Sequence, residues 1–234
     1  MTPTTHASTA TSSPGTSADQ AVARFDSAKA AAKYSTALIG TTTHRREVRC
    51  ILGGLNNVSS GAGVLDLPCG TGRLLPALTG RGFRVTSADS SPHMVDLAKL
   101  YAHECHLSVN PADFVVANVL ETPFSDGQFE AVVCNRLFHH FREPLVRQDA
   151  LRELMRICRG PIIASFFCSA SWDGVVFHIK NSLRRHKATD RIPIPRRVFE
   201  QDVRAASLRV SRWLPIRPGI SKQWYAVLER PLAT

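Results

Sequence analysis

Short apolar runs alternate with longer segments whose apolar residues recur every three or four positions between residues 64 and 167. The runs predict buried strands, and the longer period predicts amphipathic helices. Five strands are expected, at residues 64–67, 83–89, 114–117, 129–134 and 161–167. The fifth run is apolar throughout, as expected for a central strand that is covered on both faces. Alternating strands and helices predict an α/β fold with a doubly wound sheet.

The segments around and beyond these strands complete the expected fold. Ser91 and Pro92 supply an N-cap and a first-turn proline for a helix after the second strand. Residues 172–187 form a basic amphipathic pattern, with apolar residues on one face and Lys and Arg on the other. A helix that begins near Pro195 and two strands at 207–214 and 223–229 are expected to close the sheet.

The chain of 234 residues is expected to form one domain with additions at its ends. The first 17 residues are rich in Thr, Ser, Pro and Ala and carry no Lys, Arg, Asp or Glu, so residues 1–18 are predicted to be a disordered tail. Residues 19–60 are predicted to form an N-terminal helical cap. The α/β domain is expected over residues 61–234, with a basic helical insertion at 168–195.

The net charge of +10 is concentrated near the C-terminus. Residues 180–222 hold twelve Lys or Arg and three acids, a net of +9. A solvated basic face is the commonest meaning of such a pattern, and an anionic substrate, nucleic acid or a lipid surface are the functional alternatives.

Six cysteines are scattered without a CxxC pair, which is typical of free thiols in a reducing compartment. The chain begins with no basic and apolar leader, and no run of about 18 apolar residues occurs, so a cytoplasmic protein without a transmembrane segment is expected. The sequence His103-Glu104-Cys105-His106 lacks a second cluster that would complete a tetrahedral site. No metal site is therefore predicted.

Residues 64–73 read VLDLPCGTGR, an apolar run that ends at an acid and turns through two glycines. Gly70 and Gly72 allow the backbone to approach a ligand, and Asp89 ends the next strand, where a carboxylate can accept ribose hydroxyls. A dinucleotide-binding turn would need its third glycine at position 75, where Leu75 stands, so a nicotinamide oxidoreductase is disfavoured. Pro68 precedes the glycines, and its fixed φ can pre-set the turn.

Four segments in order resemble the class I S-adenosylmethionine-dependent methyltransferases, particularly the branch that acts on small molecules. They are VLDLPCGTGR, SADSSPHMV, ANVLETPFSDGQFEAVVC, and LFHHF followed by ALRELMRICRG. The resemblance covers about residues 64 to 167. It implies a Rossmann-like methyltransferase fold with a mostly parallel seven-stranded sheet, S-adenosylmethionine as cofactor, and methyl transfer by in-line displacement.

The resemblance also implies a role for each matching position. Asp66, Gly70 and Gly72 would line the methionine part of the cofactor, with Pro68 stiffening their loop. Asp89 would bind the ribose hydroxyls and Ser90 would pack beside the adenine. Asn118 and Val119 would lie near the adenine amino group, at the place where the family usually has an acid followed by a small residue. Asn135 would lie near the methyl-transfer centre.

His139 and His140 follow the fourth strand at the edge of the expected active site. A neutral histidine can deprotonate an acceptor, and packing at the start of a helix is the alternative role. The acceptor is expected to be a small or medium-sized molecule, and the hypothesis for the basic insertion is that it recognises an anionic or lipid-linked acceptor.

Two other functions remain as alternatives. The C-terminal charge favours an RNA methyltransferase, but no RNA-binding module is recognisable, and Cys134-Asn135-Arg136-Leu137 is not the Asn/Asp-Pro-Pro-Tyr/Phe motif of amino-methylating nucleic-acid enzymes. A non-catalytic S-adenosylmethionine-binding protein would bind the cofactor without turnover.

Overall fold

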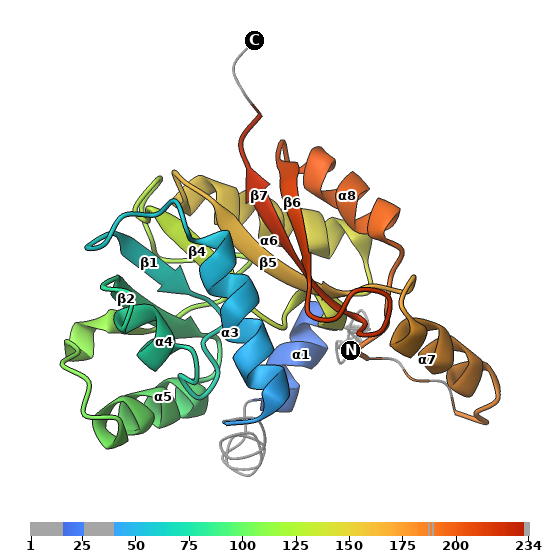
Figure 1. Cartoon of the computed structure of the whole chain (residues 1–234), viewed down its shortest axis with the longest axis horizontal. Coiled ribbons are helices and arrows are strands. Elements are labelled where there is room, and N and C mark those ends of the chain that lie inside the picture. The colour runs from blue at the N-terminus through green and yellow to red at the C-terminus, as the bar shows by residue number, and fades with distance from the viewer. Residues whose placement is uncertain (1–15, 26–39, 187, 189, 232–234) are drawn as a thin grey trace, which may run out of the picture.

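The computed structural model describes residues 16–25, 40–186, 188 and 190–231. These residues form a seven-stranded sheet with helices packed around it (Figure 1). The strands are β1 (Gly63–Asp66), β2 (Arg84–Asp89), β3 (Phe114–Val116), β4 (Ala131–Cys134), β5 (Ile162–Phe167), β6 (Arg209–Pro215) and β7 (Gln223–Glu229). Their spatial order is β3-β2-β1-β4-β5-β7-β6. Strands β1 to β5 pair in parallel, and β7 runs antiparallel to both β5 and β6. The predicted doubly wound, mostly parallel sheet is confirmed.

Helices cover both faces of this sheet (Figure 1). The α-helices are α1 (Ser17–Phe25), α3 (Thr42–Gly54), α4 (Leu75–Thr79), α5 (Pro92–Glu104), α6 (Pro144–Ile157), α7 (Trp172–Ser182) and α8 (Arg196–Ala205). Two short 3₁₀ helices are η1 (Pro111–Asp113) and η2 (Phe138–His140). Helix α5 begins as predicted, because Pro92 opens it and the Ser91 hydroxyl accepts the backbone N–H of Met94.

Alternation along the strands divides the core into two layers. In β1, Val64 belongs to a buried cluster that includes residues of α3 and α4, whereas Leu65 belongs to a second cluster that includes residues of α6 and α8. Successive side chains of a strand point to opposite faces, so a strand between two helical layers must be apolar at every position. Every residue of β4 and β5 is buried accordingly.

Helix α1 begins at Ser17, so its first two residues fall within the predicted N-terminal tail of residues 1–18, while residues 1–15 lie outside the described residues. Ser17 and Ala18 are buried. The Ser17 hydroxyl bonds the Glu143 side chain and accepts the backbone N–H of Arg142 at 3.0 Å. These partners lie far along the chain, so composition alone could not locate the helix start. Of the predicted cap at 19–60, residues 26–39 are not described.

Helix α7 ends at Ser182, five residues earlier than the helix predicted over 172–187. The Asn181 side-chain oxygen accepts the backbone N–H of Ala188 at 2.6 Å, which turns the chain back after the helix. None of the helices in the described part of the chain is both long enough and apolar enough to cross a bilayer.

The strand order reverses at β1, which lies between β2 and β4. The chain runs from β1 through β2 to β3 on one side of β1, and it then crosses to β4 on the other side of β1. Ligands of open α/β sheets bind at such a switch point, at the carboxyl ends of the strands. The carboxyl ends of β1, β2 and β4 are therefore where a site is expected.

Candidate active site

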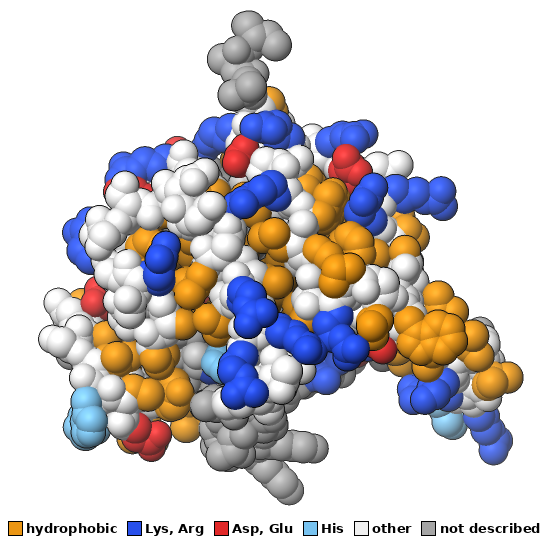
Figure 2. Space-filling model, viewed as in Figure 1, with side chains coloured by type: hydrophobic (Ala, Val, Ile, Leu, Met, Phe, Trp, Pro, Cys, Tyr) orange, Lys and Arg blue, Asp and Glu red, His pale blue; other side chains and the backbone are white. Residues whose placement is uncertain are grey.

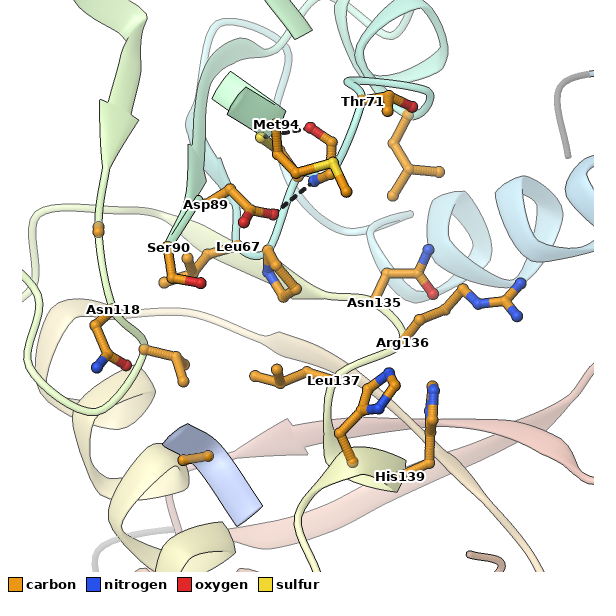
Figure 3. Close-up of a pocket in the computed structure, with 18 of the residues that line it drawn as sticks. Leu67, Thr71, Asp89, Ser90, Met94, Asn118, Asn135, Arg136, Leu137 and His139 are labelled. Carbon is orange, nitrogen blue, oxygen red and sulfur yellow. Dashed lines mark hydrogen bonds between the residues drawn. The ribbon is translucent and has the colours of Figure 1, made fainter. Parts of the chain in front are cut away.

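A pocket lies at the carboxyl ends of β1, β2 and β4 (Figure 3). Its wall comes mainly from the segments that follow β1, β2, β3 and β4, and Ala18 of α1 and Arg191 complete it. In Figure 3, Asn118 and Arg136 lie toward opposite ends of this pocket, with Asp89 and Ser90 between them. The pocket is thus elongated along the strand ends.

Nine of the eleven predicted site residues line the pocket. They are Pro68, Gly70, Asp89, Ser90, Asn118, Val119, Asn135, His139 and His140. Asp66 and Gly72 lie outside this lining. Gly72 has a φ of 77°, and a Cβ there would come within 3.0 Å of the Ala98 backbone, so this glycine allows the loop to pack against α5.

The loop after β1 is tied to the end of β2 by Asp89. The backbone N–H of Gly70 donates to Asp89 Oδ2 at 2.9 Å, and that of Ser91 donates to Oδ1 at 3.0 Å. Burial raises the pKa of the Asp89 carboxyl, and the hydrogen bonds from the Ser91 and Gly70 backbones oppose that shift. Gly70 has a φ of 53°, and a Cβ there would meet no atom within 4 Å, so the backbone faces open space in the pocket.

Pro68 fits the loop without loss of a ladder hydrogen bond. On either side of it, the Leu67 N–H bonds Val133 O at 2.9 Å and the Cys69 N–H bonds Ala88 O at 2.7 Å. A residue between these two anchors needs no N–H of its own, which is the condition that proline requires.

Asp66 is fully buried, and neither of its carboxylate oxygens has a hydrogen-bond partner among the described residues. Burial raises the pKa of its carboxyl to about 8. The carboxyl is therefore mostly protonated at neutral pH, although Arg73 acts in the opposite direction.

Asp66→Asn is expected to stabilise the folded protein, increasingly as the pH rises. Between pH 4 and pH 8 the folded state keeps a proton on Asp66 that the unfolded chain releases, so wild-type stability falls with rising pH in that window. Asparagine cannot ionise, so the variant does not lose stability in this way as the pH rises. After the cost of burying the amide is subtracted, the free energy of unfolding is expected to rise by about 2 kcal/mol near pH 7. Urea unfolding of both proteins at several pH values measures this. A gain that is independent of pH would contradict the shifted pKa of Asp66.

Asn118 lies at the exposed end of the pocket, and Val119 beside it is buried. The Asn118 side-chain oxygen accepts the backbone N–H of Leu120 at 3.1 Å, which fixes the orientation of the amide. An amide oxygen has two lone pairs, so this contact leaves it capable of a second hydrogen bond.

A buried polar network fixes Asn135 after β4. The Tyr225 hydroxyl donates to Asn135 Oδ1 at 2.8 Å, with the Ser165 hydroxyl at 3.4 Å and the Gln223 amide at 3.5 Å. Burial raises the pKa of Tyr225 well above its ordinary value, so this hydroxyl remains a neutral donor. All three contacts use the oxygen of Asn135, and none uses its amide nitrogen, which can donate into the pocket.

Sequence reasoning missed two arginines of the pocket wall and the acid that holds them. Glu47 of α3 is fully buried and pairs with Arg73 at 2.6 Å and with Arg136 at 3.2 Å. Arg73 follows the glycine loop and Arg136 follows β4, so one carboxylate fixes two segments of the pocket. Arg136 has a φ of 63°, and its N–H donates to Ser165 Oγ at 2.7 Å.

The two histidines differ in their surroundings. His139 stacks on Phe167 with ring centroids 3.9 Å apart, and its buried Nδ1 has no hydrogen-bond partner among the described residues. Burial is the largest cause that lowers the pKa of His139 well below its ordinary value. Electrostatic repulsion from His140, Arg136 and Lys222 lowers this pKa further. His140 Nδ1 lies 2.5 Å from the Asp190 carboxylate, a partner that the sequence analysis did not identify.

The His140–Asp190 contact has a chemical consequence. A carboxylate at Nδ1 favours the neutral tautomer that carries its proton on that nitrogen, and Nε2 is the basic atom of the ring in this tautomer. Both histidines line the pocket, and among the described residues His140 is the one whose ring has a carboxylate against it.

Comparisons with known proteins agree with this architecture. Residues 64–160 match a family model described as a methyltransferase domain. Ubiquinone biosynthesis O-methyltransferases from Xylella fastidiosa and Xanthomonas campestris are 33% and 34% identical over 98 and 97 residues, which is 42% and 41% of this chain. The matched segment spans only 39% of the length of either relative.

Solved structures extend the similarity over most of the chain. Magnesium protoporphyrin IX methyltransferase from Synechocystis, with bound SAH, aligns with a TM-score of 0.68 at 17% identity, covering 90% of this chain and 99% of that one. The 1,6-didemethyltoxoflavin-N1-methyltransferase of Burkholderia thailandensis gives a TM-score of 0.64 at 17% identity, covering 93% and 91%. These findings support the predicted class of S-adenosylmethionine-dependent methyltransferases, because residues 64–160 match a methyltransferase domain and the aligned methyltransferase structures share the fold of this chain.

Proposed function

We propose that this protein transfers a methyl group from S-adenosylmethionine to a hydroxyl of a small or medium-sized acceptor. The observation that supports the proposal is that two groups of residues, one suited to the cofactor and one basic, lie in the same pocket. Asp89 and Gly70 form a ribose-binding arrangement beside the glycine loop, and His140 with Asp190 forms a basic group near the other wall. The relatives named as O-methyltransferases support oxygen as the acceptor atom.

The pocket residues fit the cofactor. The open space above Gly70 admits a ligand against the backbone, and the Asp89 carboxylate can accept both ribose hydroxyls. Asn118 and Val119 would hold the adenine, with Ser90 packing against it. Asn135, Arg73 and Arg136 would bind the charged methionine end, because an amide donor and two guanidiniums suit a carboxylate.

When bound, S-adenosylmethionine supplies a methyl group that its sulfonium already makes electrophilic. The residues of this chain then need to align an acceptor oxygen with that methyl and exclude water. His140 Nε2 accepts the hydroxyl proton, and Asp190 holds the ring and stabilises the resulting imidazolium. His139 stays neutral because of its lowered pKa, and as a residue that lines the pocket beside His140 it would contact the acceptor.

The acceptor is proposed to be anionic or lipid-linked. Among the basic residues that are not assigned to the cofactor, Arg191 lines the pocket and Lys222 is close enough to lower the pKa of His139. A wall of this charge favours an anionic group on the acceptor. It also favours the phenolate or alkoxide that forms as the hydroxyl loses its proton.

Calorimetry with the full chain tests the cofactor assignment directly. S-adenosylmethionine and S-adenosylhomocysteine are expected to bind with one site per chain, and NAD is expected not to bind. A screen of metabolite and lipid fractions for transfer of a labelled methyl group then identifies the acceptor. Binding of NAD without binding of either sulfur nucleoside would overturn the proposal.

Asp190→Asn is expected to lower kcat roughly tenfold, and His140→Gln roughly 100-fold, because the reaction loses its oriented base. Affinity for S-adenosylmethionine is expected to stay near the wild-type value, since neither residue belongs to the proposed cofactor wall. Steady-state kinetics and calorimetry measure the two effects separately. Asp173→Asn, an exposed acid of the same insertion, is the matched control. An unchanged kcat in His140→Gln would assign this histidine to packing.

A further inference from the structure

Helix α7 stands away from the sheet at the edge of the molecule (Figure 1). Its first turn is anchored: the Trp172 N–H bonds Gly219 O at 2.9 Å, and the Asp173 N–H bonds Ile220 O at 3.0 Å. Gly174 is the one buried residue of the helix, and a Cβ there would come within 2.6 Å of Cys168 O. Beyond this first turn, the helix projects from the body of the protein.

The exposed face of α7 is apolar. Its large exposed side chains are Trp172, Val175, Ile179 and Leu183, at 66%, 44%, 55% and 81% exposure. The spacing of three, four and four residues puts them within an arc of roughly 80° at 3.6 residues per turn. Side chains on such a stripe usually pack against a core, so a stripe turned to solvent indicates a binding surface.

Basic residues accompany this stripe. Lys180 lies in the last turn, Arg184 and Arg185 follow directly, and all three are exposed. Asp173 is the one acid between residues 172 and 186. Figure 2 shows this projection as apolar side chains with Lys and Arg beside them. The surface formed by Trp172, Val175, Ile179 and Leu183 with these three cations is called the α7 surface below.

We propose that the α7 surface docks on an anionic lipid membrane. The apolar stripe enters the boundary between headgroups and acyl chains, and the three cations bind the anionic headgroups. Trp172 suits that boundary because its ring is apolar and its N–H is polar. Binding by this surface is separate from methyl transfer and does not rest on the function proposed above.

The chemistry of the surface favours a membrane over other occupants. A second copy of the chain would bring the two sets of cations together around a narrow stripe, and like charges oppose such pairing. RNA would use the cations, but its phosphates make no use of four exposed apolar side chains. An anionic bilayer uses both features at once.

Co-sedimentation of the full chain with vesicles tests the proposal. We expect binding to vesicles that contain phosphatidylglycerol and at least tenfold weaker binding to pure phosphatidylcholine, because the cations contribute only at an anionic surface. A combined Trp172→Ser, Ile179→Ser and Leu183→Ser variant should bind the anionic vesicles at least tenfold more weakly. The matched control is Leu100→Ser with Val116→Ser, two exposed apolar residues near the opposite edge of the sheet, which should bind like wild type.

Further measurements separate the outcomes. The serine variant should keep wild-type affinity for S-adenosylmethionine in calorimetry, which shows that it is folded whatever the acceptor proves to be. Equal sedimentation of the variant and wild type would overturn the proposal. It would also be overturned by light scattering that shows a dimer which the variant abolishes. Binding of RNA that the variant retains, without vesicle binding by wild type, would overturn it as well.

Discussion

Asp89→Ala is expected to lower the affinity for S-adenosylmethionine roughly 100-fold or more while the protein stays folded. The carboxylate would accept both ribose hydroxyls, and hydrogen bonds to a charged acceptor contribute about 1.5–3 kcal/mol each. Losing two of them corresponds to about 3–6 kcal/mol, where each 1.4 kcal/mol is tenfold in affinity. Calorimetry with S-adenosylmethionine and S-adenosylhomocysteine should show the same loss, because the ribose is common to both.

The variant also removes the acceptor of the Gly70 and Ser91 backbone N–H groups, so a control must separate binding from loop structure. Asp89→Asn keeps one oxygen acceptor without the charge, and its affinity should fall between those of the wild type and the alanine variant. Asp96→Ala is the matched control on α5, where the carboxylate is 73% exposed and pairs only at the surface. Wild-type affinity in Asp89→Ala would remove Asp89 from the proposed cofactor wall.

The sheet could be predicted because its signals are local. Strands β1, β4 and β5 are buried, so each appears in the sequence as an apolar run bounded by polar or glycine-containing turns. The loop after β1 carries its own glycines, and its acid partner Asp89 sits at the end of the next strand. Nine of the residues named from the sequence line the pocket because they lie at or after the carboxyl ends of β1, β2, β3 and β4.

The remaining features depend on contacts between distant segments. Glu47 occurs in the polar stretch THRREVR, which is typical of a solvated helix, and its burial depends on arginines from two loops. Asp190 lies 50 positions from His140, so no local pattern joins them. The glycine motif likewise identifies a turn without showing which glycine faces the ligand. Gly70 opens to the pocket, whereas Gly72 packs on α5.

Glu47→Ala is expected to destabilise the protein by about 3–4 kcal/mol, because it leaves two guanidiniums without their buried counter-charge. This loss of stability is smaller than the largest losses that follow when a buried ion pair is broken, because the Arg136 side chain is 26% exposed to water. Urea unfolding measures this change. Affinity for S-adenosylmethionine should also fall, because Arg73 and Arg136 are no longer held at the methionine end of the pocket.

Two further variants show whether this loss belongs to the ion pairs. Arg49→Ala removes an exposed charge from the same helix and should change the free energy of unfolding by less than about 0.5 kcal/mol. Adding Arg136→Ala to Glu47→Ala should cost less than the sum of the two single changes, because the first has already removed the partner of the second. Additive losses would mean that Glu47 stabilises α3 by packing alone, and the link between the N-terminal helices and the pocket would then not be electrostatic.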